Sequence, residues 1–170
     1  MSERESYVPS HPGLFQVNFK PGDYGSVLIA CKGFEAGEVI AHLAGLTKAP
    51  RSYATMQCGR GPDDHVLLNS DLLYVNHSCD PNIAFDLSSP DQSKWRAYAL
   101  KRIAIGEPLT FFYPSTEWLM DQPFDCTCGA PSCLRRIGGA AILSEEELLS
   151  RGAVNSWISD AIQQRDIASS

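Results

Sequence analysis

The sequence predicts a single, mainly β domain that ends in α-helices, and three observations support this prediction. The chain has 170 residues, which suffice for one hydrophobic core and leave no room for a second full domain. Up to about residue 113, short apolar runs alternate with glycine and proline, as in strands joined by turns. After Gly138 and Gly139, capped segments with a helical apolar period replace this pattern.

The expected strands form a mostly antiparallel meander. Two of them follow the same kind of turn, in which Gly37 and Gly106 each supply a residue that tolerates positive φ. The apolar runs that predict strands lie at 27–30, 39–43, 66–68, 83–87, 95–100 and 109–112.

A short helix is expected just after the last of these strands. Ser115 and Thr116 can cap its first turn, residues 117–120 would form it, and Pro123 would end it. A loop that contains three cysteines follows.

Two further helices are expected at the C-terminus. Ser144 and Glu147 form a capping box, because the serine can accept the Glu147 amide while the carboxylate reaches back, and the helix should run to about Arg151. Asn155 or Ser156 can cap the second helix. We expect both helices to pack on the strands. The apolar residues that share one face of the second helix are Trp157, Ile158, Ala161 and Ile162.

Charge and hydropathy narrow the range of partners. The net charge is −6, from 14 lysines and arginines against 20 aspartates and glutamates. Such a surface repels a phosphate backbone and attracts cations, so we expect a basic protein or peptide partner and no direct nucleic-acid binding. The polar first ten residues and the lack of a run of about 20 apolar residues predict a soluble intracellular protein, nuclear or cytoplasmic, with no membrane contact.

Three cysteines crowd together at 126, 128 and 133, with glycine and proline between them to turn the chain back. Structural zinc takes four tetrahedral ligands, usually thiolates, so this cluster predicts a zinc site that needs one more ligand. Free or disulfide-bonded thiols are the alternative. The candidates for the fourth ligand are Cys31, Cys58 and Cys79.

Residues 76–82, Asn-His-Ser-Cys-Asp-Pro-Asn, resemble the central motif of SET-domain methyltransferases. Residues 106–113, Gly-Glu-Pro-Leu-Thr-Phe-Phe-Tyr, resemble the Gly-Glu-Glu-Leu-Thr-Phe-Asp-Tyr motif of the same family, and the three clustered cysteines look like its post-SET zinc motif. Alone, the first motif would read as turn chemistry, because Asn, Ser and Asp before proline commonly stabilise turns. The resemblance spans about residues 24–137.

This resemblance implies a SET-domain fold, a β-clip-like set of small curved sheets in which residues 76–82 and the strand ending at Tyr113 make a knot-like crossing. It also implies S-adenosylmethionine as cofactor. Asn76 and His77 match positions that contact the cofactor in the family. Asp23, Tyr24 and Gly25 stand where the family has a Gly-x-Gly turn near the cofactor, so that only the second glycine is kept.

The remaining site residues also follow from the resemblance. Tyr113 matches the catalytic tyrosine, and Phe111 the position that influences how many methyl groups are added. Cys79 matches the fourth zinc ligand, beside Cys126, Cys128 and Cys133. Trp118 and Phe124 could stack on the adenine of the cofactor.

Four parts are expected along the chain: an N-terminal segment (1–20), the SET domain (21–122), a post-SET zinc-binding segment (123–139) and a C-terminal helical extension (140–170). The expected activity is methylation of lysine side chains in a protein, with histones among the candidates. Departures from the family pattern at Asp23, Leu43 and Phe112 leave two alternatives, a weak or inactive binding module and a methyltransferase for a non-lysine acceptor.

Overall fold

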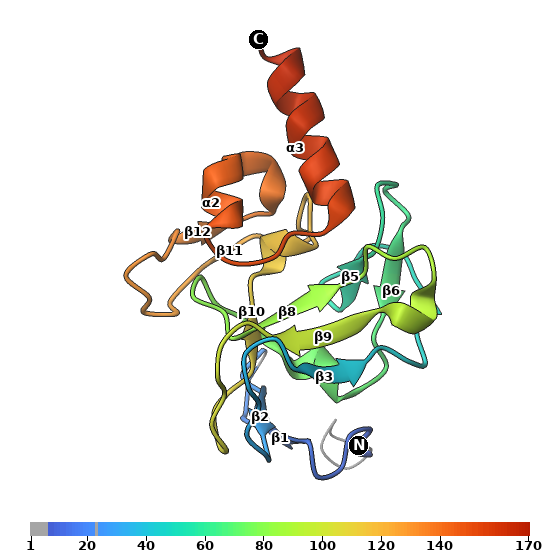
Figure 1. Cartoon of the computed structure of the whole chain (residues 1–170), viewed down its shortest axis with the longest axis vertical. Helices are drawn as coiled ribbons and strands as arrows, with labels where there is room; N and C mark the ends of the chain where they lie inside the picture. The colour runs from blue at the N-terminus through green and yellow to red at the C-terminus, as the bar shows by residue number, and fades with distance from the viewer. Residues whose placement is uncertain (1–6, 23) are drawn as a thin grey trace.

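The structure is a computed structural model that describes residues 7–22 and 24–170. In this described part the strands form five small sheets, and the α-helices lie at the C-terminal end (Figure 1). The mainly β class with C-terminal helices is therefore confirmed. None of the described helices is both long enough and apolar enough to cross a membrane.

The central sheet has the strand order β3-β9-β8, formed by β3 (Val39–His42), β9 (Arg96–Ala99) and β8 (Ile83–Asp86). Both pairings are antiparallel, but β9 lies between two strands that precede it, so the simple meander expected from the sequence is wrong. Three consecutive residues of β8, Ile83 to Phe85, are buried, which shows that protein covers both faces of this strand.

Two antiparallel units flank the central sheet. β1 (Phe15–Asn18) pairs with β2 (Val27–Ala30), and their alternate residues are buried. A three-stranded sheet of order β4-β6-β5 is built from β4 (Thr47–Lys48), β6 (His65–Leu67) and β5 (Thr55–Gln57).

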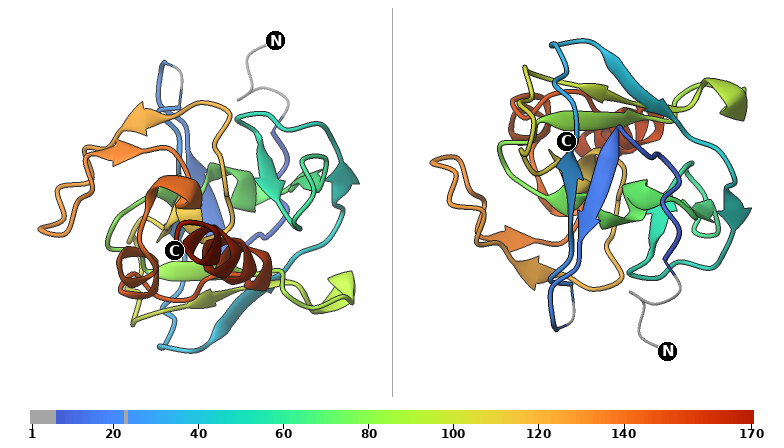
Figure 2. Two further views of the ribbon diagram at one scale, coloured as in Figure 1. Left: turned by 90° about the horizontal axis from the view of Figure 1, so that it is seen from above. Right: turned by 90° about the horizontal axis from the view of Figure 1, so that it is seen from below.

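Two further pairs position the site. β7 (Asn76–His77) runs parallel to β10 (Thr110–Phe111), and β11 (Phe124–Asp125) pairs with β12 (Arg136–Ile137) in antiparallel fashion. Seen from above and below, the loop between β11 and β12 lies at the edge of the molecule (Figure 2).

All six strand regions expected from apolar runs contain a strand. Gly37 and Gly106 have φ values of 84° and 85°, as the two matching turns predicted. Half of the strands in the described part of the chain lacked such a signal, because polar residues interrupt or replace their apolar residues: β1, β4, β5, β7, β11 and β12.

Short 3₁₀ helices connect several strands: η1 (Asp71–Tyr74), η2 (Gln92–Lys94), η3 (Tyr113–Ser115) and η4 (Ala140–Ile142). The helix expected at 117–120 is wrong, since η3 ends before it. The backbone N–H of Gln57 donates to Glu117 Oε1 at 2.7 Å, and that of Trp118 donates to Gln57 Oε1 at 2.8 Å. Pairing with β5 thus holds this segment in a non-helical path.

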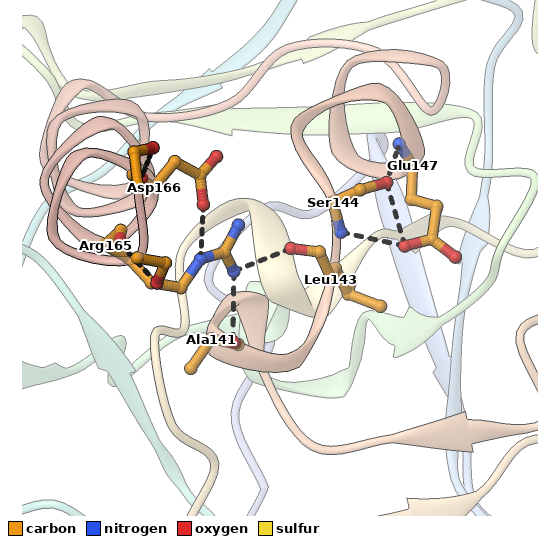
Figure 3. Close-up of polar contacts among 8 residues, drawn as sticks. Ala141, Leu143, Ser144, Glu147, Arg165 and Asp166 are labelled. Carbon is orange, nitrogen blue, oxygen red and sulfur yellow. Dashed lines mark hydrogen bonds and ion pairs between the residues drawn. The ribbon is translucent and has the colours of Figure 1, made fainter.

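The two C-terminal helices are α2 (Glu145–Leu149) and α3 (Ser156–Ala168). The capping box of Ser144 and Glu147 is confirmed and is visible in Figure 3. Figure 3 also shows Arg165 of α3, whose guanidinium donates to the carbonyl oxygens of Ala141 and Leu143 and so ties α3 to the segment before α2. Of the four apolar residues predicted on one face of α3, Trp157, Ile158 and Ile162 are buried and Ala161 is partly exposed.

Candidate active site and metal centre

The site is built where two distant segments lie side by side. In the parallel pair β7–β10, Asn76 lies opposite Thr110 and His77 opposite Phe111. Asn82 fastens the pair, because its amide donates to the Pro108 carbonyl at 2.9 Å and its side-chain oxygen accepts the Thr110 N–H at 2.8 Å. This polar side chain is 3% exposed, so these bonds replace the water it loses on folding.

A cavity of about 540 Å³ opens beside this pair. Its volume lies in the range of small-molecule sites, roughly 300–1,000 Å³. Its wall combines residues from the β7–β10 pair, from residues 47–71, called the insert below, and from the segment between η3 and the cysteine loop. The residues expected in the site that line it are Tyr24, Asn76, His77, Phe111, Tyr113, Phe124, Cys126 and Cys128.

Tyr113 lies at the start of η3, with its ring 4.7 Å from that of Phe111 between centroids. Its hydroxyl donates to the Val75 carbonyl at 3.3 Å. Burial, followed by the charge of Glu117, raises the pKa of Tyr113 to about 12, so the phenol is neutral at physiological pH. Since its proton is directed to Val75, its oxygen lone pairs remain available as acceptors.

His77 connects the cavity to the cysteines. Its Nδ1 accepts the Tyr113 N–H at 3.2 Å, and its Nε2 lies 3.4 Å from the Cys79 sulfur. Burial, with a smaller effect from Arg151, lowers the pKa of His77 to about 4. The ring is therefore neutral, and with Nδ1 acting as acceptor its proton sits on Nε2, toward the sulfur.

The outer end of the cavity is lined by an aromatic pair from different segments. The rings of Tyr24 and Tyr53 meet edge to face at 5.4 Å, and the Tyr24 hydroxyl donates to Gln122 at 3.0 Å. Tyr24 has a φ of 61°, an uncommon backbone conformation for a residue other than glycine.

Glu117 is a partly buried acid of the cavity. Its backbone N–H donates to the Tyr113 carbonyl at 3.1 Å, which places the two residues one turn apart on the same wall. Burial raises the pKa of Glu117 to about 7, although the Gln57 N–H and, less strongly, Thr116 and Arg51 act in the opposite direction.

Four cysteines meet beside the cavity. The sulfur atoms of Cys79, Cys126, Cys128 and Cys133 all lie within 4.8 Å of one another. A tetrahedral zinc with bonds of about 2.3 Å holds its sulfurs about 3.8 Å apart, so the donor set and its spacing fit this metal. The Leu134 N–H also donates to the Cys79 sulfur at 3.4 Å, which favours a thiolate there. Of the three candidates for the fourth ligand, only Cys79 joins the cluster.

Other expected site residues lie elsewhere. Gly25 does not line the cavity, and a Cβ there would lie 3.3 Å from Lys20 Cβ and from the Pro21 oxygen, so close packing of its own loop accounts for the glycine. Asp23 lies outside the described residues. Trp118 is also absent from the cavity wall and packs partly buried against the core, whereas Phe124, the other aromatic residue expected beside an adenine, lines the cavity.

Sequence reasoning missed the residues contributed by the insert and by the segment after η3. The family motifs do not include Tyr53, Gln57 or Glu117. The only signal for Glu117 was a single acid in an otherwise uncharged stretch, four residues after Tyr113.

Comparison with known proteins shows which family the chain resembles. The family model described as SET domain matches residues 25–114. "Methyltransferase flvH" of Aspergillus flavus is 37% identical over 155 residues, which cover 91% of this chain and 84% of the relative. "Histone-lysine N-methyltransferase ASHH3" of Arabidopsis thaliana is 38% identical over 66 residues, but these cover only 38% of this chain and 18% of that protein.

A solved structure shares the fold. The crystal structure of KRYPTONITE in complex with mCHG DNA and SAH superposes with a TM-score of 0.54 at 20% sequence identity. The match covers 72% of this chain and 29% of that one.

Proposed function

We infer the activity of this chain from the family to which it belongs, the SET-domain family. The family model covers more than half of the chain, and the relative flvH, itself named a methyltransferase, matches nearly all of it. The chain is an S-adenosylmethionine-dependent SET-domain methyltransferase. What we propose is its acceptor, the lysine side chains of a basic protein, with core histones as the first candidates.

The charge of the site supports a cationic acceptor. The acids Glu117, Asp121 and Asp125 line the cavity, and no lysine or arginine does so among the described lining residues. The net charge of −6 acts in the same direction over a longer range. A lysine side chain has a pKa of about 10.4 and therefore approaches as an ammonium, which the acidic cavity attracts.

We propose that Asn76, His77 and Tyr24 hold the cofactor, with Asp23 and Gly25 in the adjoining turn. When bound, S-adenosylmethionine supplies an electrophilic methyl group on a sulfonium. The polar edge of β7 and the ring of Phe124 offer hydrogen-bonding and stacking partners in a cavity of fitting volume.

In the proposed mechanism Tyr113 orients the acceptor. Its oxygen accepts an N–H of the amine, which points the nitrogen lone pair away from the phenol. Phe111, 7% exposed, has no hydroxyl that would hold a water or an unmethylated amine, so room remains for nitrogens with two or three methyl groups.

One observation argues against an inactive binding module. Phe112, which replaces a polar residue of the family, does not fill the cavity; it is buried against the His77 ring and beneath the Arg151 guanidinium. A non-lysine acceptor is the second candidate, because the histone-methylating relatives align over much less of this chain than flvH does.

Labelling identifies the acceptor. Purified zinc-loaded protein is incubated with S-adenosylmethionine carrying a heavy methyl group and with core histones or a cell extract, followed by mass spectrometry. We expect label on lysine nitrogens. Label exclusively on other atoms would support the second candidate, and cofactor binding without any label would support the binding module.

A further inference from the structure

The cavity is lined by one partly buried acid, Glu117, that the family motifs do not assign. Glu117 lines the same wall as Tyr113, and its backbone is tied to that residue by the 3.1 Å hydrogen bond. Resting on the proposed function, we propose that the Glu117 carboxylate binds the ammonium of the acceptor and removes its proton before methyl transfer.

The carboxyl group has one committed oxygen and one free oxygen. The Gln57 N–H at 2.7 Å and the more distant Thr116 hydroxyl at 3.5 Å both donate to Oε1. Within the described residues Oε2 has no hydrogen-bond partner. A carboxylate held through one oxygen keeps its orientation while the other can receive a proton.

The surroundings favour a proton acceptor that works near neutral pH. The charged and titratable groups that face Glu117 in the described part of the chain are Arg51 from the insert, Cys58 after β5 and Tyr113 of η3. Desolvation outweighs the positive charge of Arg51 and raises the pKa of Glu117 to about 7. General bases work best when their pKa lies near the working pH.

The proton balance of the step is simple. One N–H bond of the ammonium breaks and an O–H bond forms at Glu117, so a cation and a carboxylate become a neutral amine and a carboxylic acid. The amine lone pair is then available for the methyl group. Glu117 returns its proton to solvent after the product leaves.

A structural role alone is the alternative. Glu117 joins β5 to the segment after η3, and this link could be the whole reason for an acid here. Glu117→Gln separates the two roles, because the amide oxygen can still accept the Gln57 N–H while the group can no longer take a proton.

The first test measures binding of n-butylamine, a lysine side-chain analogue, by NMR from pH 5.5 to 9. In the wild-type protein, binding should strengthen as pH rises through about 7, because the carboxylate forms there. Glu117→Gln should bind at least about tenfold more weakly and without this pH dependence. The control is Glu146→Gln, the same chemical change at an exposed position of α2.

The second test is the pH profile of kcat/KM with core histones from pH 6 to 9.5. Wild-type activity should rise to a plateau above about pH 7. Glu117→Gln should be about a hundredfold slower at pH 7 and should keep rising toward the amine pKa of about 10.4.

The outcomes separate this inference from the proposed function. Amine binding that depends on Glu117, without histone methylation, would keep the inference and reject the histone acceptor. Methylation with the same pH profile and amine affinity in Glu117→Gln would overturn the inference alone. If the variant does not fold, a wild-type protein whose amine binding does not change between pH 6 and 8 would overturn it equally.

Discussion

The hydroxyl of Tyr113 donates a hydrogen bond to the Val75 carbonyl, and the packing of the ring does not depend on this bond. Tyr113→Phe keeps the ring contact with Phe111 and removes the group that orients the amine. We expect turnover on core histones to fall about a hundredfold or more, comparable to the loss of one preorganised polar group in other active sites. Cofactor affinity, measured by calorimetry, should stay nearly unchanged. Full activity in this variant would show that Tyr113 is structural.

Phe111 sets the space available at the acceptor nitrogen. Its ring packs at 4.8 Å from Phe85 and at 4.7 Å from Tyr113, so it cannot withdraw from the cavity without disturbing both. Phe111→Tyr adds a hydroxyl that can hold a water or an amine N–H. We expect products with fewer methyl groups, read as the ratio of mono-, di- and trimethyllysine by mass spectrometry. An unchanged ratio would contradict this role.

Asp71 fastens the N-terminal segment to the domain. It is 1% exposed and accepts the Tyr7 hydroxyl at 2.6 Å and the backbone N–H groups of Ser10 and His11 at 3.1 and 2.8 Å. Burial acts to raise the pKa of Asp71, but these hydrogen bonds and nearby His11 together lower it. The stability it supplies is therefore full above the unfolded-state pKa of about 3.9 and is lost as pH falls through the lower folded pKa.

Asp71→Asn is expected to lower the free energy of unfolding by about 2–3 kcal/mol at pH 7, since hydrogen bonds to a charged group are lost. The difference from wild type should shrink below about pH 4, where the native carboxylate also becomes protonated. Urea unfolding at pH 7 and at pH 3.5 measures both values. The control is Asp63→Asn, an exposed aspartate between β5 and β6, and an equal loss in the two variants would contradict the assignment.

Among the elements, α3 fixes the segment that carries the site. The side-chain amide of Asn155, just before α3, donates to the Phe85 and Ser115 carbonyls, and its oxygen accepts the Leu87 N–H at 2.8 Å. The Trp157 indole donates to the Thr116 carbonyl at 3.0 Å. The C-terminal helices therefore hold the backbone between Tyr113 and Glu117 against the central sheet, although the family model ends at residue 114.

Asn155→Ala is expected to destabilise the protein by about 2–4 kcal/mol, because it leaves buried backbone groups without partners. Thermal or urea unfolding measures the loss. Ser156→Ala, at the exposed next position, is the matched control. Since the segment after Tyr113 also loosens, methyl transfer should fall even at temperatures where the variant remains folded. A variant as stable as the control would show that α3 does not support the site.

The positions of several strands could be predicted from the sequence, but their order in the sheet could not. Apolar runs located β2, β3, β8 and β9 because their residues are buried in contiguous or alternating patterns. They could not show that β9 lies between β3 and β8, since antiparallel order depends on long-range packing. Asn155, one of the two expected caps of α3, lies at the N-cap position, but its side chain bonds to the Leu87 N–H after β8 and to the Ser115 carbonyl of η3 instead of to the helix.

Some residues of the candidate site could likewise be predicted from the sequence, and others could not. Residues in dense motifs, such as Asn76, His77 and Tyr113, could be located from the sequence, and the structure brings them to one cavity. Glu117 could not, because its burial depends on β5, about 60 residues earlier in the chain. The local sequence pattern around Glu117 favoured a helix, but the hydrogen bonds to Gln57 hold this segment in a non-helical conformation.

In the whole molecule, the cysteine cluster joins two parts that are distant in sequence, and Arg151 links a third part to it. Cys79 follows the proposed cofactor-binding residues, whereas its three partners lie in the loop between β11 and β12. Arg151, after α2, donates to the Ser132 carbonyl of that loop at 2.6 Å and lies over the Phe112 ring. We propose that the SET domain (21–122), the post-SET segment (123–139) and the extension (140–170) form one cooperative unit around this centre.

Zinc removal tests this unit as a whole. Structural zinc contributes apparent free energies of about 10 kcal/mol or more in small sites, so chelation or Cys79→Ser should lower the melting temperature strongly and reduce zinc below one ion per chain. Cys58→Ser, at a partly buried cysteine outside the cluster, is the control. Because His77 lies between Tyr113 and Cys79, loss of the metal should also abolish cofactor binding. Full zinc content and stability in Cys79→Ser would instead mean that the cluster does not hold the metal through this residue.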